Sequence, residues 1–257
     1  MSFTHALLRP PPPSFERGLT TSDEGPPNLE RALREHQVYV TALESCGLSV
    51  SLLSADEEFP DSCFIEDTAI LTPRGAIATR PGAASRLGEV ESVAASLRVW
   101  YPELARIMPP GTVDGGDVCE ADGHFLIGLS RRTNDEGARQ LTAWLADLGY
   151  PADTIDIRAN PRLLHLKSGL AYLGAGRMVR TSDLRADRAL QPYDQMVVPD
   201  VERYAANCLA VNGRLLIAAG YPQFTEMLDR QGYPLVAIEM SEFRRMDGGL
   251  SCLSLRF

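Results

Sequence analysis

One pattern of turns and apolar runs recurs along the chain, and this recurrence limits the fold more than any other feature. Pairs of short apolar runs joined by a turn occur at residues 63–80, 116–128, 169–180 and 207–219. Asp-Gly and Asn-Gly turns between such runs predict β-hairpins. A fifth copy appears if the two ends of the chain pair, SCLSLRF with THALLRP. The sequence therefore predicts five hairpins, one of them formed by both termini.

A helical pattern and then one more apolar run follow the hairpins. The third helix, near residues 181–195, is polar and weakly patterned, whereas the others have apolar residues at helical spacing or clear capping signals. The predicted helices cover residues 28–46, 86–98, 135–148 and 222–231. The apolar runs after the helices lie at residues 49–53, 106–108, 154–157, 195–198 and 234–239. The predicted unit is strand, strand, helix, strand.

Five such units, the last shared by both termini, predict a closed α/β ring around a central cavity. Closure through the chain ends removes the exposed sheet edges that would invite aggregation. The alternative is an open α/β protein whose hairpins only look alike. A chain of 257 residues is long enough to bury a sizeable core in either case.

Charge and cysteine content exclude several classes of protein. With 25 basic and 34 acidic residues the net charge is −9, which argues against nucleic acid or an anionic membrane as a partner and permits a cationic small ligand. The N-terminal region lacks the pattern of a signal peptide, and no apolar stretch is long enough to span a membrane. The five cysteines are scattered and include no CxxC pair, so we expect neither a disulfide framework nor a structural zinc site. These features predict a soluble cytoplasmic globular protein.

Cys252 lies near the end of the chain in the segment MDGGLSCLSLRF, behind a Gly-Gly turn and on a predicted short strand. We expect this turn to require glycine conformations and to hold the thiol in a fixed place, which makes Cys252 a candidate nucleophile. A single cysteine on an apolar strand is more often a small buried hydrophobe. We assign that packing role to the other four cysteines, Cys46, Cys63, Cys119 and Cys208.

The loops at corresponding ends of the other units carry acids, a histidine and arginines. Acids within an apolar stretch are costly to bury unless a cation or hydrogen-bond donors satisfy them. A histidine between leucines is more often a satisfied core residue, and most arginines are surface charges. Together these residues form a candidate site for a zwitterionic amino acid with a cationic head group. They are Asp61, Glu66 and Asp67 in FPDSCFIED, Asp114 and Asp117 in GTVDGGD, His165 in LLHLKSG, and Arg86 and Arg132 at equivalent places after the first two hairpins.

Seven segments of the chain resemble the dimethylarginine dimethylaminohydrolase family, which belongs to the guanidino-modifying enzymes. They follow one another in the family's order over nearly the whole length: FPDSCFIEDTAI, ATRPGAASR, PGTVDGGDV, GLSRRTN, LLHLKSGLAYL, YAANCL and MDGGLSCLS. The fold of this family is a five-bladed α/β propeller. The resemblance thus implies one catalytic α/β-propeller domain spanning residues 1–257.

The resemblance also implies a role for each candidate residue. Cys252 is similar to the family's nucleophile, His165 to its general acid and base, and Asp114 to the acid that orients the histidine. The remaining positions correspond to substrate contacts: Glu66 and Asp67 to the guanidinium, Asp61 and Asp247 as further acids, Arg86 and Arg132 to the α-carboxylate, and the backbone carbonyls of Leu19 and Met246 to the α-amino group.

The implied reaction is hydrolysis of Nω-methylated L-arginine to L-citrulline and methylamines through a covalent thiouronium on Cys252. It requires no metal and no organic cofactor. Two alternatives stay open: an arginine deiminase, whose members are usually longer, and a non-catalytic propeller that binds a macromolecule. An amidinotransferase is disfavoured by length. The sequence leaves open the preference among methylated arginines, a homodimeric state, and control of Cys252 by zinc or oxidation.

Overall fold

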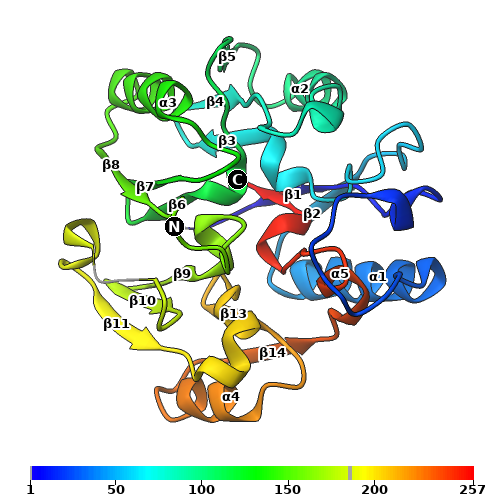
Figure 1. Cartoon of the computed structure of the whole chain (residues 1–257), viewed down its shortest axis with the longest axis vertical. Coiled ribbons are helices and arrows are strands. Elements are labelled where there is room, and N and C mark those ends of the chain that lie inside the picture. The colour runs from blue at the N-terminus through cyan, green and yellow to red at the C-terminus, as the bar shows by residue number, and fades with distance from the viewer. Residues whose placement is uncertain (1, 185–186) are drawn as a thin grey trace. The chain divides into compact units, whose positions relative to one another are not determined.

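The computed structural model of the chain describes residues 2–184 and 187–257. The chain divides into two compact units, which we call unit 1 (the chain up to Ile65 together with Val198–Phe257) and unit 2 (Glu66–Val197). The described residues form five three-stranded sheets (Figure 1), two in unit 1 and three in unit 2. Each sheet contains one antiparallel pair, and its third strand pairs parallel to the middle strand.

Unit 2 contains three of the predicted hairpins, each followed by a parallel strand. Its helices are α2 (Glu89–Leu97) and α3 (Asp135–Asp147). In the third sheet the described part of the predicted helix near 181–195 contains a 3₁₀ turn at Arg188–Leu190, and residues 185–186 lie outside the described residues. The strands are β3 (Ala69–Thr72), β4 (Gly75–Ala78), β5 (Leu104–Arg106), β6 (Val118–Ala121), β7 (His124–Leu129), β8 (Ala152–Asp156), β9 (Leu170–Gly174), β10 (Arg177–Arg180) and β11 (Asp194–Val197).

Unit 1 contains the fourth hairpin and the predicted pairing of the chain ends, which is confirmed. Ala6 lies opposite Arg256 in an antiparallel pair, and the N–H groups of Thr4 and His5 donate to the Phe257 carbonyl at 2.9 and 2.8 Å. The strands are β1 (His5–Leu8), β2 (Ser49–Leu52), β12 (Leu209–Val211), β13 (Arg214–Ala218), β14 (Leu235–Ile238) and β15 (Leu255–Arg256), and the helices are α1 (Leu29–Ser45), α4 (Pro222–Asp229) and α5 (Ser241–Arg244).

The predicted turn chemistry explains where the hairpins form. Asp122 and Gly123 between β6 and β7 have φ of 51° and 80°, and Asn212 and Gly213 between β12 and β13 have 47° and 81°. Positive φ at both central residues matches the right-handed twist of the strands and favours Asp-Gly and Asn-Gly. α1 begins as predicted after Asn28, whose side chain accepts from the Arg31 N–H at 2.9 Å.

In each of the sheets that the structure describes, a 3₁₀ turn precedes one strand of the antiparallel pair. These turns are Ile65–Thr68 before β3, Gly115–Asp117 before β6, Leu166–Ser168 before β9, Asp200–Ala206 before β12 and Ser251–Leu253 before β15. The prediction that Cys252 lies on a strand is therefore wrong. A strand at Cys252 would have to pair with β1, but β1 ends at Leu8. The chain continues with Arg9 and the prolines that begin at Pro10, and proline lacks the N–H group that strand pairing requires.

Each unit has its own apolar core. In unit 1, Phe15, Phe64 and Phe243 pack ring against ring, with centroids 5.7–6.3 Å apart. In unit 2, Leu141 and Leu145 of α3 are fully buried against the sheet of β6, β7 and β8. Among the described residues there is no helix long and apolar enough to cross a membrane.

Candidate active site

The 3₁₀ turns carry most of the candidate residues. In unit 2, Glu66 and Asp67 lie in the turn before β3, Asp117 lies in the turn before β6, and Asp114 and His165 immediately precede their turns. In unit 1, Cys252 lies in the turn before β15. These candidate residues therefore lie in or directly before the turns that precede the strands.

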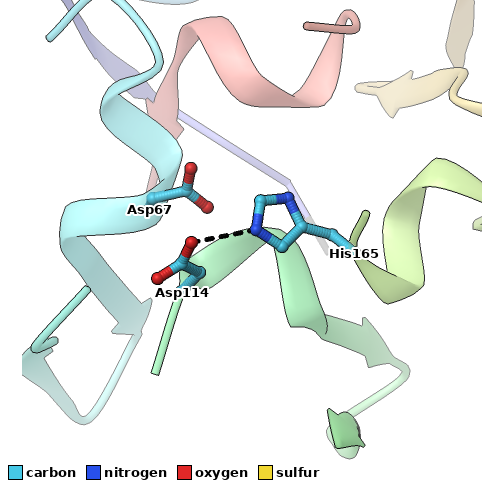
Figure 2. A group of neighbouring side chains, drawn as sticks. All are labelled: Asp67, Asp114 and His165. Atoms are coloured by element: carbon cyan, nitrogen blue, oxygen red, sulfur yellow. Dashed lines mark hydrogen bonds and ion pairs between the residues drawn. The ribbon is translucent and has the colours of Figure 1, made fainter. Parts of the chain in front are cut away.

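His165 and Asp114 form a buried hydrogen-bonded pair (Figure 2). His165 Nε2 lies 2.9 Å from Asp114 Oδ2, and Asp114 is fully buried. The second oxygen, Oδ1, accepts from the Gly82 N–H at 2.7 Å, and the Asp114 N–H donates to Thr133 Oγ1 at 3.1 Å. Asp114 is therefore held on both sides and sets the orientation of the imidazole.

Asp67 faces the same imidazole (Figure 2). One polar atom from each of Asp67, Asp114 and His165 lies within 4.8 Å of the others. Burial by itself raises the pKa of Asp67, but the charges of His165 and Arg86 outweigh it and lower the pKa to about 2. Burial lowers the pKa of His165, but Asp67 and the hydrogen bond to Asp114 outweigh it and raise the pKa to about 9. At neutral pH a buried imidazolium thus faces the side chains of both Asp67 and Asp114.

Arg86 is buried and binds two carboxylates of its own unit. Its Nη1 lies 2.6 Å from Asp67 Oδ2, and its Nε and Nη2 lie 3.0 and 2.8 Å from the two oxygens of Glu89. Burial lowers the pKa of Arg86, but the charges of Glu89 and Asp67 raise it well above its usual value. The predicted contact of Arg86 with a substrate carboxylate stays a prediction. Glu89 was missed, although its spacing three residues after Arg86 is typical of a helical ion pair.

Lys167 was not predicted from the sequence, and Asp117 was named as a candidate without a role. Lys167 Nζ lies 2.6 Å from Glu66 Oε1, so this acid also has a cation of the same chain. Asp117 accepts hydrogen bonds from Ser130 Oγ and Thr133 Oγ1 at 2.6 and 2.7 Å, and from the Leu166 N–H at 2.9 Å. Burial raises the pKa of Asp117 to about 6. Asp117 therefore fixes the turn next to His165. For the partner of Glu66, the available sequence signal was a lysine two residues after His165, in the segment HLKSG.

Gly116 lets the histidine approach the backbone. A Cβ at this position would lie 2.6 Å from His165 Nδ1 and 3.0 Å from Asp67 Oδ1, while its N–H donates to Asp67 Oδ1 at 2.7 Å. A side chain here would displace the imidazole. The GTVDGGD motif therefore supplies both an acid and the space that the histidine needs.

The substrate-binding candidates of unit 1 come from three stretches of the chain, around residues 19, 61 and 246–247, which hydrogen bonds connect. The Leu19 N–H donates to both oxygens of the buried Asp61 at 3.0 and 3.2 Å. The Thr21 N–H and Oγ1 donate to Asp247 Oδ2 at 2.5 and 2.9 Å. Asp61 and Asp247 thus hold residues 19–21. The predicted use of the Leu19 and Met246 carbonyls for an amino group stays a prediction.

Cys252 is half-buried, unlike the other four cysteines, which are buried as predicted. Its Sγ accepts from the Gly249 N–H at 3.4 Å. The expected reason for the Gly-Gly turn is wrong, because neither glycine has a positive φ; the residue that does is Asp247, at 58°. A Cβ on Gly248 would lie 2.2 Å from the Phe64 ring, and one on Gly249 would lie 2.5 Å from Asn207 Oδ1. Glycine is required here for close packing.

Arg132 is half-buried in the loop after β7. Its N–H donates to Ser130 Oγ at 2.9 Å, and its carbonyl oxygen packs so closely on Gly82 that a Cβ there would lie 2.2 Å away. The loop is therefore well anchored. A contact of the guanidinium with a substrate carboxylate stays a prediction.

The cluster of Asp67, Asp114 and His165 has the ligand types of a divalent cation site. However, both oxygens of Asp67 accept from Gly116 and Arg86, and those of Asp114 bond to Gly82 and His165. A metal would have to displace these partners. The arrangement suits proton transfer by an oriented imidazole better than metal binding.

Comparisons with known proteins place the chain in a family, although no family model matches it. It is 43% identical over 256 residues to the N(G),N(G)-dimethylarginine dimethylaminohydrolase of Pseudomonas aeruginosa, covering 99% of this chain and 100% of that one. A solved structure of a Cys-to-Ser variant of the Pseudomonas aeruginosa enzyme, complexed with citrulline, has a TM-score of 0.97, 42% identity and full coverage of both chains. A His-to-Gly dimethylarginine dimethylaminohydrolase bearing an adduct with S-methyl-L-thiocitrulline has a TM-score of 0.96 and 42% identity, covering 99% of this chain and 100% of that one.

These matches confirm the predicted fold class, because the repeated three-stranded sheets correspond to the α/β propeller of those structures throughout. The likeness extends over the full length of both chains, at 43% identity. The chain therefore belongs to the dimethylarginine dimethylaminohydrolase family.

Proposed function

We propose that this chain hydrolyses Nω-methylated L-arginine, both asymmetric dimethylarginine and monomethylarginine, to L-citrulline and dimethylamine or methylamine. Membership of the family supports the reaction, and a relative binds citrulline, the expected product. The observation that carries the proposal is the buried imidazolium of His165, hydrogen-bonded to Asp114 and facing Asp67. Such a group supplies a proton to a departing amine.

For binding, we assign the guanidinium of the substrate to Glu66 and Asp67. Both acids are buried, and each is within 2.6 Å of a cation of the chain, Lys167 and Arg86 respectively. The charges of His165 and Arg86 lower the pKa of Asp67 to about 2, so this acid is ionised in the absence of substrate. A bound guanidinium joins or replaces those cations, and charge-assisted hydrogen bonds hold its plane in place.

The other end of the substrate is assigned to the remaining candidate residues. Arg132 and Arg86 pair with the α-carboxylate, because the guanidinium group offers bidentate geometry. The α-amino group binds the carbonyls of Leu19 and Met246, which neighbour the Asp61 and Asp247 anchors described above. Asp61 and Asp247 add negative charge for a cationic ligand.

The first chemical step is attack by the Cys252 thiolate on the central guanidinium carbon. A carbon–sulfur bond forms and the carbon becomes tetrahedral, with its electron pair on nitrogen. His165 then donates its proton to the methylated nitrogen, the carbon–nitrogen bond breaks, and neutral dimethylamine or methylamine leaves. A thiouronium remains on Cys252.

The second step regenerates the enzyme. Neutral His165 removes a proton from water as the water oxygen attacks the thiouronium carbon. The carbon–sulfur bond then breaks, the thiolate of Cys252 departs, the remaining hydroxyl proton passes to solvent water, and the ureido carbonyl of citrulline forms. The hydrogen bond from Asp114 keeps the imidazole aligned for both proton transfers. No step requires a metal or an organic cofactor.

The test is citrulline formation from asymmetric dimethylarginine and from arginine, with wild type and Cys252→Ser side by side. We expect turnover of the methylated substrate and its loss in the variant, with unchanged circular dichroism. Turnover of arginine with release of ammonia would instead assign a deiminase. A folded wild-type protein that produces no citrulline from either substrate would refute an enzymatic role.

A cytoplasmic location and a homodimer complete the proposal. A free amino-acid substrate requires only a small-molecule site and neither nucleic acid nor membrane, in keeping with the net charge of −9. Light scattering of the protein as it elutes from a size-exclusion column distinguishes a dimer from a monomer. Cell fractionation tests the location.

A further inference from the structure

Asn207 adjoins the 3₁₀ turn before β12, and the corresponding turns of the other sheets carry or adjoin the candidate reactive groups. It directly follows the 3₁₀ turn Asp200–Ala206, and one residue, Cys208, separates it from β12. The turns before β3 and β15 contain Asp67 and Cys252, and the turns before β6 and β9 directly follow Asp114 and His165. The proposed reaction gives Asn207 no role, although it is buried and belongs to the YAANCL segment.

The amide of Asn207 makes a two-point contact with the residue before Cys252. Asn207 Oδ1 accepts from the Ser251 N–H at 3.0 Å, and Asn207 Nδ2 donates to Ser251 Oγ at 3.0 Å. A planar amide with both ends engaged fixes its partner in position as well as orientation. The contact therefore constrains the backbone from which the Cys252 side chain departs.

The same amide packs on the residue that donates to the thiol. The Cα of Gly249 lies so close that an added Cβ would be 2.5 Å from Asn207 Oδ1 and 2.6 Å from Asn207 Cγ. Gly249 in turn donates its N–H to Cys252 Sγ at 3.4 Å. Asn207 thus contacts both the neighbour of Cys252 in the chain and the hydrogen-bond donor to its sulfur.

A second side chain from the same turn supports this geometry. Tyr204 donates its hydroxyl hydrogen to the Gly248 carbonyl at 2.8 Å. Residues 204 and 207 therefore hold residues 248–251 at successive points. Glycines at 248 and 249 allow this close approach but cannot by themselves keep the turn rigid.

We propose that Asn207 is a positioning residue that holds the 249–252 turn so that the Gly249 N–H and the Cys252 sulfur stay aligned. This inference deepens the proposed function and rests on it, because it assumes that Cys252 is the nucleophile. Asn207 does not touch the substrate. Its effect on turnover comes through the placement and ionisation of the thiol.

The experiment compares Asn207→Ala with Asn212→Gly as a matched control. Asn212 also uses its amide for backbone contacts, at 2.8 Å to the Phe3 N–H and at 3.0 Å to the Cys46 carbonyl. Its φ of 47° suits glycine, and its contacts do not involve residues 248–252. Three quantities are measured: kcat and KM, the thermal midpoint, and the rate of Cys252 alkylation by iodoacetamide against pH, with the modified residue identified by mass spectrometry.

For Asn207→Ala we expect kcat to fall by about 10²-fold with KM changed less than about threefold, because small misplacements of a reacting group cost that much. The pH midpoint of Cys252 alkylation moves upward by about one unit, as loss of one aligned donor predicts. Asn212→Gly lowers the thermal midpoint but leaves kcat and the alkylation profile as in wild type. Ser251→Ala, which removes one of the two contacts, falls between wild type and Asn207→Ala.

An Asn207→Ala protein with wild-type kcat and an unchanged alkylation profile would overturn the inference, and so would a purely thermal effect equal to that of Asn212→Gly. If Asn207→Ala does not fold, Asn207→Asp, which keeps the acceptor for the Ser251 N–H, is judged by the same criteria. Alkylation does not depend on turnover. Failure of the proposed function would therefore be seen as an inactive wild type, whereas failure of this inference leaves wild type active and Asn207→Ala unchanged.

Discussion

At the scale of single residues, the buried charges of unit 2 determine the pH range in which the His165 and Asp67 side chains stabilise the fold. The pKa of His165 is raised to about 9, so its contribution to stability is complete below its unfolded value near 6.5 and is lost as pH rises through 9. The pKa of Asp67 is lowered to about 2, so its contribution is present above 3.8 and is lost as pH falls through 2. The pair is therefore most stable from mildly acidic to near-neutral pH.

Asp114→Asn tests the origin of the His165 shift. Loss of the carboxylate removes one of the interactions that raise the pKa of His165, so the alkaline limb of kcat/KM moves to lower pH by about one unit. Titration of the His165 ring by NMR measures this independently of turnover. Asp153→Asn is the control, because Asp153 contacts a different histidine, His124, at 3.0 Å. An unchanged His165 titration in Asp114→Asn would contradict the assignment.

His36 on α1 is expected to lower the stability of the fold in acid. It is 3% exposed, its Nε2 has no hydrogen-bond partner among the described residues, and burial lowers its pKa to about 4. The folded state binds fewer protons than the unfolded chain between pH 4 and 6.5, so stability falls as pH drops through that range. We expect wild type to lose roughly 2 kcal/mol from this group between pH 7 and pH 5.

His36→Asn provides the measurement for that prediction. Asparagine keeps a donor near the position of Nδ1, which faces the Arg9 backbone, and it does not titrate. Urea unfolding at both pH values should show a smaller loss in the variant than in wild type. An equal loss in the two proteins would show that other groups cause the acid sensitivity.

At the scale of elements, short polar motifs determine where helices and turns begin. Asn134 precedes α3 and connects it to the loop before Asp114. Its Oδ1 accepts from the Gly137 and Thr112 N–H groups at 2.8 and 3.0 Å, and its Nδ2 donates to the Pro110 carbonyl at 2.9 Å. One side chain therefore satisfies a helix terminus and a neighbouring loop together.

Asn134→Ala should lower the free energy of unfolding by about 1–2 kcal/mol, as loss of an N-cap does. Asn134→Asp keeps the acceptor but not the donor to Pro110, so we expect a smaller loss. Denaturant titration of the two variants and wild type measures the difference. Equal stability of Asn134→Ala and wild type would mean that water replaces all three contacts at no cost.

At the scale of the whole molecule, the chain ends belong to one sheet. β1 pairs with β15 at Ala6–Arg256 and Leu7–Leu255, and the N–H groups of Thr4 and His5 donate to the Phe257 carbonyl. Because the termini are already joined by hydrogen bonds, a covalent link between them should cost little.

A circular permutant tests this arrangement. A short Gly/Ser linker joins the original ends, and the new ends open the turn at Gly174–Gly176, where an added Cβ at either glycine has nothing within 4 Å. We expect the permutant to fold and to keep citrulline formation within about threefold of wild type, since surface turns tolerate such cuts. Deletion of Leu255–Phe257 removes the partner of β1 and should abolish activity. An inactive permutant that is folded would contradict the prediction.

Much of the architecture could be predicted because its signals are local. Asp-Gly and Asn-Gly turns and helix-capping signals act on their immediate neighbours, and hairpins and helices formed where these signals predicted them. The 3₁₀ turns were missed because they depend on where a partner strand ends. Cys252 is the example. Its sequence neighbours are typical of a strand, but β1 ends at Leu8 and Cys252 lies in a 3₁₀ turn.

The amino-acid sequence alone was sufficient for the order of elements, the pairing of the chain ends, the family and the membership of Asp114 and His165 in one group. Only the tertiary structure decided which cation accompanies which acid, Arg86 with Asp67 and Glu89, and Lys167 with Glu66. Turn formation depends on a few adjacent torsion angles, whereas an ion pair depends on distances between side chains that are far apart in the chain. Burial then strengthens the interactions between those charges, and no local sequence pattern indicates how deeply a side chain is buried.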